Sequence, residues 1–290
     1  MESEKEFLKN YNADEVAKIV IEEGVKAVTT GAGNPSKYIA AWKEAGVKVM
    51  PVVASVAMAK MMERAGADCV VAEGMESGGH IGSITTMCLL PQVADAVSIP
   101  VIGAGGIADG RGLAAAKMLG AEAVQMGTAF LVAKENIVHE NFRNKVINAK
   151  DIDSVVTGTS TGHPVRSIRN KMTKEYLKLE SQGVELMELE KLTLGSLRRA
   201  VIDGDDKTGT LMAGQIAGLI KEEKSCKDII EQIIIVTKLL RVVYFLMEWQ
   251  KRPEKQMVSS NECGEMIMVL GRRKGQRRLC SNAWIACGTV

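Results

Sequence analysis

A histidine and a glutamate share one glycine-rich stretch of the sequence, AEGMESGGHIG at residues 72–82. His80 is the first histidine of the chain, and Gly78 and Gly79 precede it. Histidine titrates near neutral pH, which suits it to move protons, and glycines let the backbone pass close to a ligand. Glu73 lies in the same stretch, directly after an apolar run. We therefore take His80 as the candidate catalytic residue, carried by a flexible loop over the ring of a bound cofactor.

Two further strand ends carry glycines, within IPVIGAGGIADG (99–110) and AVQMGTAF (123–130). The first contains Gly105 and Gly106, and the second contains Gln125, Gly127 and Thr128. Glycines let backbone N–H groups approach a ligand, and a following helix N-terminus favours an anion. Two glycine-bearing strand ends in succession are typical of the phosphate site of (β/α)8 barrels. Either strand end alone could have glycines only because the backbone is tightly packed there. The spacing does not match the dinucleotide fingerprint GxGxxG.

The elements that would position these residues repeat along the first part of the chain. Five apolar runs, separated by stretches with helical spacing, lie at 26–30, 47–53, 68–72, 99–104 and 122–127. Strands that alternate with helices indicate parallel βαβ units. A closed barrel needs eight units. The sequence predicts an α/β fold, either an open doubly wound sheet or an incomplete (β/α)8 TIM-type barrel of about five units. The phosphate-type strand ends favour the barrel.

The composition changes twice after this repeat and divides the chain into three regions. Residues 1–135 form the predicted partial barrel. Residues 136–232 begin with polar sequence and continue with helical patterns, so we predict a smaller, mainly helical substrate or cap domain. Residues 233–290 hold two of the three Trp, three of the six Cys and the basic stretch GRRKGQRR. We expect this last region to be a divergent tail that is solvated or disordered.

Composition and charge narrow the class of protein. A content of 46% hydrophobic and 25% charged residues fits a globular chain, and a net charge of +2 gives no reason to expect a nucleic-acid partner. No uncharged apolar run reaches the roughly 18–20 residues of a membrane span, and the charged N-terminus lacks a signal-peptide core, so we expect a cytoplasmic protein. The six cysteines form no CxxC pair, so we predict free thiols, no metal site, and Cys69 as a small buried hydrophobe.

Four stretches in order resemble those of a known family: TTGAGNPSKY, AEGMESGGHIG, IPVIGAGGIADG and GAEAVQMGTAFLVAKE. They are similar to the flavin-dependent enoyl-acyl-carrier-protein reductases of bacteria. These reductases belong with the nitronate monooxygenases, or 2-nitropropane dioxygenase-like proteins. The similarity continues through GHPVRSIRNKMT and MAGQIAGL and covers about residues 13–232.

The resemblance implies an FMN-binding (β/α)8 barrel followed by a smaller substrate domain. It implies that His80 is the active-site histidine. It implies that Glu73, Gly78 and Gly79 lie near the flavin, and monooxygenases tend to have Gln at the position of Glu73. The residues implied on the phosphate side of FMN are Gly105, Gly106, Gln125, Gly127 and Thr128.

The chain departs from the family pattern at both ends. The family begins with about three further strands, which carry a glycine-rich loop and an Asn that hold the flavin. It ends in a charged amphipathic helix where this chain has IIIVTKLLRVVYFLMEWQKRP. The resemblance therefore implies an N-terminally truncated member with a divergent tail, from a fragmentary or frame-shifted reading frame. Such a barrel would expose two parallel edges and much of its core, so we expect weak FMN binding and aggregation.

Three functions remain open at this point. The first is reduction of the double bond of enoyl-acyl-carrier-protein thioesters by NADH or NADPH through FMN, as in fatty acid biosynthesis, which Glu73 and GHPVRSIRN favour. The second is oxidation of alkyl nitronates by oxygen and FMN, with His80 as the base. The third is a non-catalytic remnant that binds a phosphate-bearing ligand. The expected partner is an acyl carrier protein thioester or a nitronate, with no nucleic acid or membrane, and a homodimer is left open.

Overall fold

The fold is built on a parallel sheet whose strands alternate with helices along the chain. The computed structural model describes residues 13–31 and 33–250, and in the last helix it describes side chains only as far as residue 240, without residue 239. The five strands lie in the order β1-β2-β3-β5-β6, with bounds Ala27–Thr30, Lys48–Val53, Val70–Glu73, Val101–Ala104 and Ala123–Gln125. Each predicted apolar run overlaps one of these strands, so the prediction of five βα units is confirmed.

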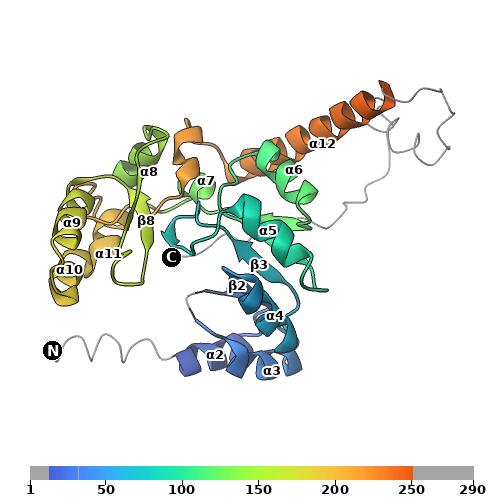
Figure 1. Cartoon of the computed structure of the whole chain (residues 1–290), viewed down its shortest axis with the longest axis horizontal. Coiled ribbons are helices and arrows are strands. Elements are labelled where there is room, and N and C mark those ends of the chain that lie inside the picture. The colour runs from blue at the N-terminus through green and yellow to red at the C-terminus, as the bar shows by residue number, and fades with distance from the viewer. Residues whose placement is uncertain (1–12, 32, 251–290) are drawn as a thin grey trace.

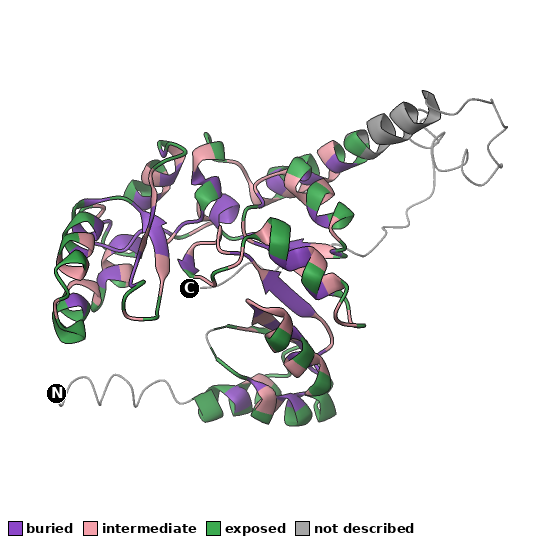
Figure 2. Ribbon diagram, in the orientation of Figure 1, coloured by how far each residue is buried: buried purple, intermediate pink, exposed green. Residues whose placement is uncertain are grey.

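Helices connect these strands and pack on the sheet (Figure 1). They are α2 (Ala13–Glu22), α3 (Ser36–Glu44), α4 (Val56–Arg64), α5 (Thr86–Ala94) and α6 (Gly110–Met118). Ile39 of α3, Val49 of β2 and Met62 of α4 are fully buried in their common core. The central strands β2, β3 and β5 hold most of the buried residues of the sheet (Figure 2). Among the described residues β1 and β6 each pair with one strand, so the sheet stays open as part of a (β/α)8 barrel.

A second, antiparallel sheet lies apart from the parallel sheet, and we call the part of the molecule around it the second lobe (Figure 1). Its strands have the order β4-β8-β7, with bounds Gly79–His80, Val165–Ile168 and Ser154–Thr157. We predicted a mainly helical domain over residues 136–232 and did not locate β7 and β8, because both are short and β8 carries the buried polar residues Arg166 and Ser167 instead of an apolar run. The surrounding helices are α8 (Glu140–Ile147), α9 (Lys171–Ser181), α10 (Leu186–Thr193), α11 (Ser196–Val201) and η1 (Gln215–Leu219).

Helix α12 (Cys226–Gln250) runs through the boundary that we predicted at residue 232. Ile229 and Ile233 are buried in the core of the parallel sheet, and the Thr237 hydroxyl lies 3.1 Å from the carbonyl oxygen of Gly110 in α6. Residues 233–250 are therefore helical, which corrects the expectation of disorder for that part of the tail. The basic stretch GRRKGQRR lies outside the described residues. No helix in the described part is long and apolar enough to cross a bilayer.

Helices α6 and α12 pack so closely at Gly110 that adding one methyl group there tests whether α12 docks on α6. A Cβ added at Gly110 would lie 2.6 Å from the Ile233 carbonyl oxygen and 2.6 Å from Val236 Cβ. We expect Gly110→Ala to lower the free energy of unfolding by about 1–3 kcal/mol, because the two helices must move apart. Gly33→Ala is the control, since a Cβ there meets no atom within 4 Å. Equal urea midpoints for the two variants would contradict docking of α12.

Candidate active site

The carboxyl ends of three neighbouring strands bring Glu73 and Gln125 to one edge of the parallel sheet. Glu73 of β3 pairs in register with Ala104 of β5, and Ala104 pairs in register with Gln125 of β6. Two strand spacings place the Glu73 and Gln125 backbones about 10 Å apart. In-register residues of parallel strands lie on the same face, so these two polar side chains flank the small Ala104 at the site edge.

Glu73 is a partly buried carboxyl at this edge. Burial raises its pKa, and the Ser77 hydroxyl offsets part of that rise. Among the described residues no Lys or Arg forms an ion pair with it. Burial therefore favours the protonated form, which can both donate and accept a hydrogen bond.

The raised pKa of Glu73 has a consequence for stability. A carboxyl whose pKa is higher in the folded than in the unfolded state favours folding while it is protonated. This contribution is complete below the unfolded-state pKa and is lost as the pH rises through the folded-state pKa. We therefore expect Glu73→Gln to raise the free energy of unfolding at pH 8 and to lose this advantage as pH falls toward about 4. Urea unfolding at both pH values measures the effect, with the exposed Glu122→Gln as control. A Glu73→Gln chain less stable than wild type at pH 8 contradicts it.

His80 lies on a strand instead of the flexible loop that we predicted. The chain turns back after β3, and His80 in β4 pairs antiparallel with Val165 of β8. The Ile81 N–H donates to the Pro164 carbonyl oxygen at 3.1 Å and extends this pairing. Gly79 has a φ of 77°, which favours glycine at the start of the strand. The His80 side chain is exposed, so the second lobe holds its backbone and leaves its imidazole accessible.

Gly78 has a structural reason to lack a side chain. A Cβ there would lie 2.7 Å from the Ala213 carbonyl carbon and 2.8 Å from the Gly214 nitrogen. The segment 211–215, which includes the start of the MAGQIAGL stretch (212–219), therefore runs directly against the loop that precedes His80. The Gln215 N–H donates to the Glu76 carbonyl oxygen at 2.9 Å in the same contact. The close approach at Gly78 is thus to the protein's own backbone, and a contact of this residue with flavin remains a prediction.

Arg166 is a residue of this region that the sequence analysis did not single out. Arg166 is only 4% exposed, and it pairs with Gly79 in the antiparallel pairing of β4 and β8. Its Nε donates to the Met75 carbonyl oxygen at 3.0 Å, and another guanidinium nitrogen donates to the Ser154 hydroxyl at 2.9 Å. Burial lowers the pKa of the guanidinium, and the nearby Glu76 carboxylate opposes that shift. Arg166 therefore ties the loop before His80 to the second sheet.

The loop after β5 carries two glycines in the left-handed region. Gly105 and Gly106 have φ values of 83° and 73°. A Cβ at Gly105 would lie 2.7 Å from the Gly74 carbonyl oxygen, so this loop packs against the loop after β3. The Thr86 hydroxyl lies 2.9 Å from the Gly105 carbonyl oxygen, and the Thr86 N–H donates to the Glu76 carboxylate at 2.9 Å. The start of α5 therefore fixes both loops.

The loop after β6 is the open part of the site. A Cβ at Gly127 would meet no atom within 4 Å, which leaves room for a ligand beside the backbone. Thr128 begins α7 (Thr128–Leu131) and is buried, and its hydroxyl oxygen accepts a hydrogen bond from the Gly214 N–H at 2.8 Å. The hydroxyl proton stays available for a second partner. These features fit a phosphate-bearing cofactor bound by backbone and hydroxyl groups.

Other reactive groups of the described chain do not add to this site. No group of three or more His, Cys, Asp or Glu there could hold a metal ion. Cys69 is partly buried at the start of β3, and burial raises its pKa to about 11, which makes its thiolate scarce at neutral pH.

Comparison with known proteins agrees with this architecture. The nitronate monooxygenase family matches residues 3–235. A probable nitronate monooxygenase of Staphylococcus saprophyticus is 36% identical over 228 residues, which cover 74% of this chain and 64% of that protein. The chain therefore spans less than two thirds of the length of this curated relative.

Two solved structures have the same fold. FabK from Thermotoga maritima is 52% identical with a TM-score of 0.78, and the match covers 82% of this chain and 75% of that one. Nitroalkane oxidase from Streptomyces ansochromogenes is 28% identical with a TM-score of 0.70, and the match covers 80% and 70% of the two chains. Together these matches show that the chain belongs to the nitronate monooxygenase family of flavin-dependent oxidoreductases.

Proposed function

We propose that the chain is an FMN-dependent reductase of enoyl-acyl-carrier-protein thioesters that uses NADH or NADPH. The observation that carries this proposal is the 52% identity to FabK, an enoyl-acyl-carrier-protein reductase, against 28% identity to the nitroalkane oxidase over a similar part of the chain. FMN supplies the hydride-carrying ring when it is bound. Gly105, Gly106, Gly127 and Thr128 would hold its phosphate, and Gln125 would lie beside them.

The remaining residues have roles that follow from their positions. His80 is accessible on a backbone held by β8, so it would exchange a proton with the substrate carbon next to the carbonyl. Glu73 lies on the sheet edge, and burial favours its protonated form. In that form it offers the donor and acceptor that Gln offers at the same position in monooxygenases. The second lobe, which contains β8, would bind the thioester.

Nitronate oxidation is the second candidate function. The curated relatives favour it, since the staphylococcal protein carries that name. In this reaction the organic substrate, not a nicotinamide, would supply the electrons to FMN, and oxygen would accept them. His80 would act as the base on the neutral nitroalkane form, removing the proton alpha to nitrogen to give the nitronate. Gly105, Gly106, Gly127 and Thr128 would hold FMN in either reaction, so these residues do not distinguish the two functions.

The two functions separate in a paired assay on the full chain. The flavin absorption of the purified chain establishes whether FMN is bound. NADH or NADPH oxidation that depends on a crotonyl thioester supports the reductase. Oxygen uptake with an alkyl nitronate in the absence of reduced nicotinamide supports the monooxygenase and overturns the reductase. A flavin-loaded chain with neither activity supports the third alternative, a non-catalytic ligand-binding protein.

A further inference from the structure

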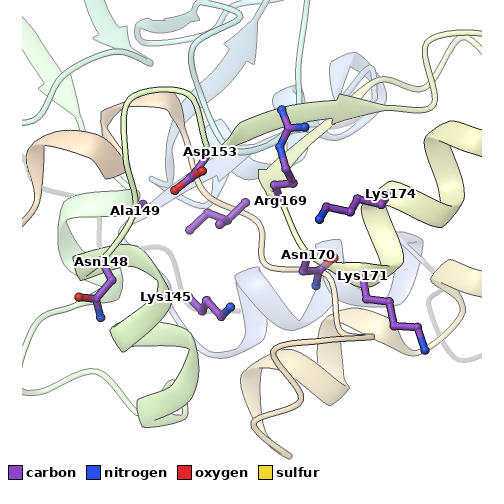
Figure 3. Close-up of a pocket in the computed structure, with 9 residues that line it drawn as sticks. Lys145, Asn148, Ala149, Asp153, Arg169, Asn170, Lys171 and Lys174 are labelled. Atoms are coloured by element: carbon purple, nitrogen blue, oxygen red, sulfur yellow. The ribbon is translucent and has the colours of Figure 1, made fainter.

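A second cavity lies at the far end of β8 from His80. It has a volume of about 480 Å³ and opens between α8 and α9 (Figure 3). Val165, at one end of β8, pairs with His80, whereas Ile168, at the other end, lines the cavity. Val165 and Ile168 are three residues apart along β8, which is a distance of about 10 Å. None of the residues that line the cavity is a candidate active-site residue.

The floor of this cavity is apolar and its sides are cationic. Ala149 and Ile168 are each 3% exposed and form the apolar floor, and the polar residue Asn170 is the third buried residue of the lining. Lys145 of α8 and Lys174 of α9 extend toward the cavity from opposite sides (Figure 3). Four cationic residues and one carboxylate, Asp153, line it; the other cations are Arg169 and Lys171.

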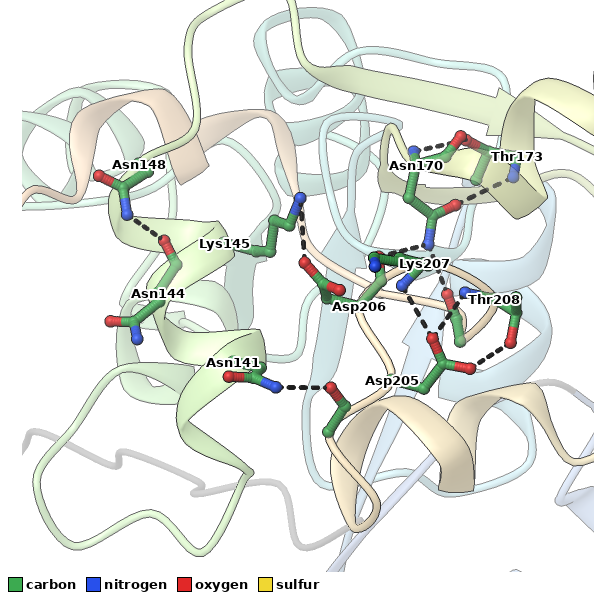
Figure 4. Close-up of polar contacts among 12 residues, drawn as sticks. Asn141, Asn144, Lys145, Asn148, Asn170, Thr173, Asp205, Asp206, Lys207 and Thr208 are labelled. Atoms are coloured by element: carbon green, nitrogen blue, oxygen red, sulfur yellow. Dashed lines mark hydrogen bonds and ion pairs between the residues drawn. The ribbon is translucent and has the colours of Figure 1, made fainter.

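Most of this positive charge is not neutralised by the protein. Arg169, Lys171 and Lys174 form no ion pair with any described residue. Lys145 Nζ lies 3.2 Å from the carboxylate of Asp206 (Figure 4). With Asp206 counted, four cationic residues and two carboxylates surround the cavity, an excess of two positive charges. Lys145 and Lys174 extend toward the cavity, whereas the charged ends of Arg169 and Lys171 point away from it (Figure 3).

The wall beside Asp206 is fixed by hydrogen bonds. The Asn170 amide donates to the carbonyl oxygens of Asp206 at 3.1 Å and Gly209 at 2.7 Å (Figure 4). The Asn170 side-chain oxygen accepts from the Thr173 N–H at 3.0 Å, and the Met172 N–H donates to the Lys207 carbonyl oxygen at 3.0 Å. These bonds use the Met172 and Thr173 N–H groups in the first turn of α9, so the lysine and arginine side chains are the main donors that remain for a ligand.

We propose that this cavity is a second anion site that binds a small phosphate-bearing molecule. Its volume lies within the roughly 300–1,000 Å³ of small-molecule sites. The apolar floor suits the organic part of such a ligand, and the amines of Lys145 and Lys174 suit the phosphate between them. Asp153 limits the affinity, because its carboxylate lines the same space. The site does not depend on flavin or on either proposed reaction.

Calorimetric titration of the full chain with inorganic pyrophosphate at constant ionic strength tests the proposal. Lys174→Met keeps the aliphatic stem and removes the charge, and we expect it to weaken binding about five-fold or more. Asp153→Asn removes the opposing carboxylate and keeps an oxygen for the Lys150 N–H, so we expect tighter binding. Lys178→Met is the matched control, since this exposed lysine of α9 does not line the cavity. We expect its affinity to stay within about two-fold of wild type.

Three results would overturn the proposal. Absence of saturable binding is the first. Equal weakening by Lys174→Met and Lys178→Met is the second, because it indicates general attraction to a basic surface. Binding that is unchanged in both Lys174→Met and Asp153→Asn is the third, because it places pyrophosphate elsewhere, for example in the loops after β5 and β6. An unchanged thermal melt confirms that each variant is folded.

Discussion

Replacing His80 with alanine is expected to lower turnover by about 100- to 10,000-fold and to leave the flavin content of the chain unchanged. The His80 side chain is exposed, and β4 is held through its backbone pairing with Val165 of β8. Alanine keeps that pairing, so the variant should melt at the wild-type temperature. A loss of activity without a loss of stability or flavin is the result that a proton-transferring residue predicts.

The exposed His163 provides the matched control for this experiment. It lies two residues before β8, so His163→Ala removes an exposed imidazole close in the chain to the strand that pairs with His80. We expect its turnover to stay within a few-fold of wild type. A His80→Ala chain with near-normal turnover contradicts the catalytic role, whichever substrate proves active.

The parallel sheet could be predicted because its signal is local. Each strand is a short apolar run, and four of the five follow a helix closed by glycine, as at Gly66 and Gly120 with φ values of 96° and 98°. The strand-end glycines were also identifiable, and Gly105 and Gly106 do take the left-handed conformation that only glycine adopts readily. Periodicity and glycine positions were therefore enough to place the candidate site at this edge of the sheet.

The second lobe could not be predicted in the same way because its signal is not local. Strand β8 contains Arg166, which is buried only because Met75 and Ser154, from two other segments, accept its hydrogen bonds. Strand β4 has two residues and exists through its pairing with β8. Gly78 illustrates the same limit, because its close partners are in residues 213–214, far along the chain. Such contacts become visible only when the fold brings the segments together.

Replacing Arg166 with methionine is expected to lower the free energy of unfolding by about 2–6 kcal/mol and to loosen the strand that carries His80. Methionine fills much of the same space and leaves the Met75 carbonyl and the Ser154 hydroxyl without their guanidinium donor. Both hydrogen bonds are part-buried and involve a charged donor, and losing each one costs about 1–3 kcal/mol. Hydrogen exchange at the Ile81 amide, which donates to Pro164, reports on loosening of β4 directly and requires no bound flavin.

Two further variants separate this role from a general effect of charge. Arg166→Lys keeps the charge, but its single amine cannot reproduce the planar fork that reaches both acceptors, so we expect intermediate stability and intermediate exchange. Arg169→Met removes an exposed arginine that forms no ion pair with the described residues, and we expect it to match wild type in both measurements. If Arg166→Met retains wild-type stability and full protection of the Ile81 amide, Arg166 does not position the His80 strand. In that case the β4–β8 pairing and the packing of Gly78 on segment 211–215 suffice to hold it.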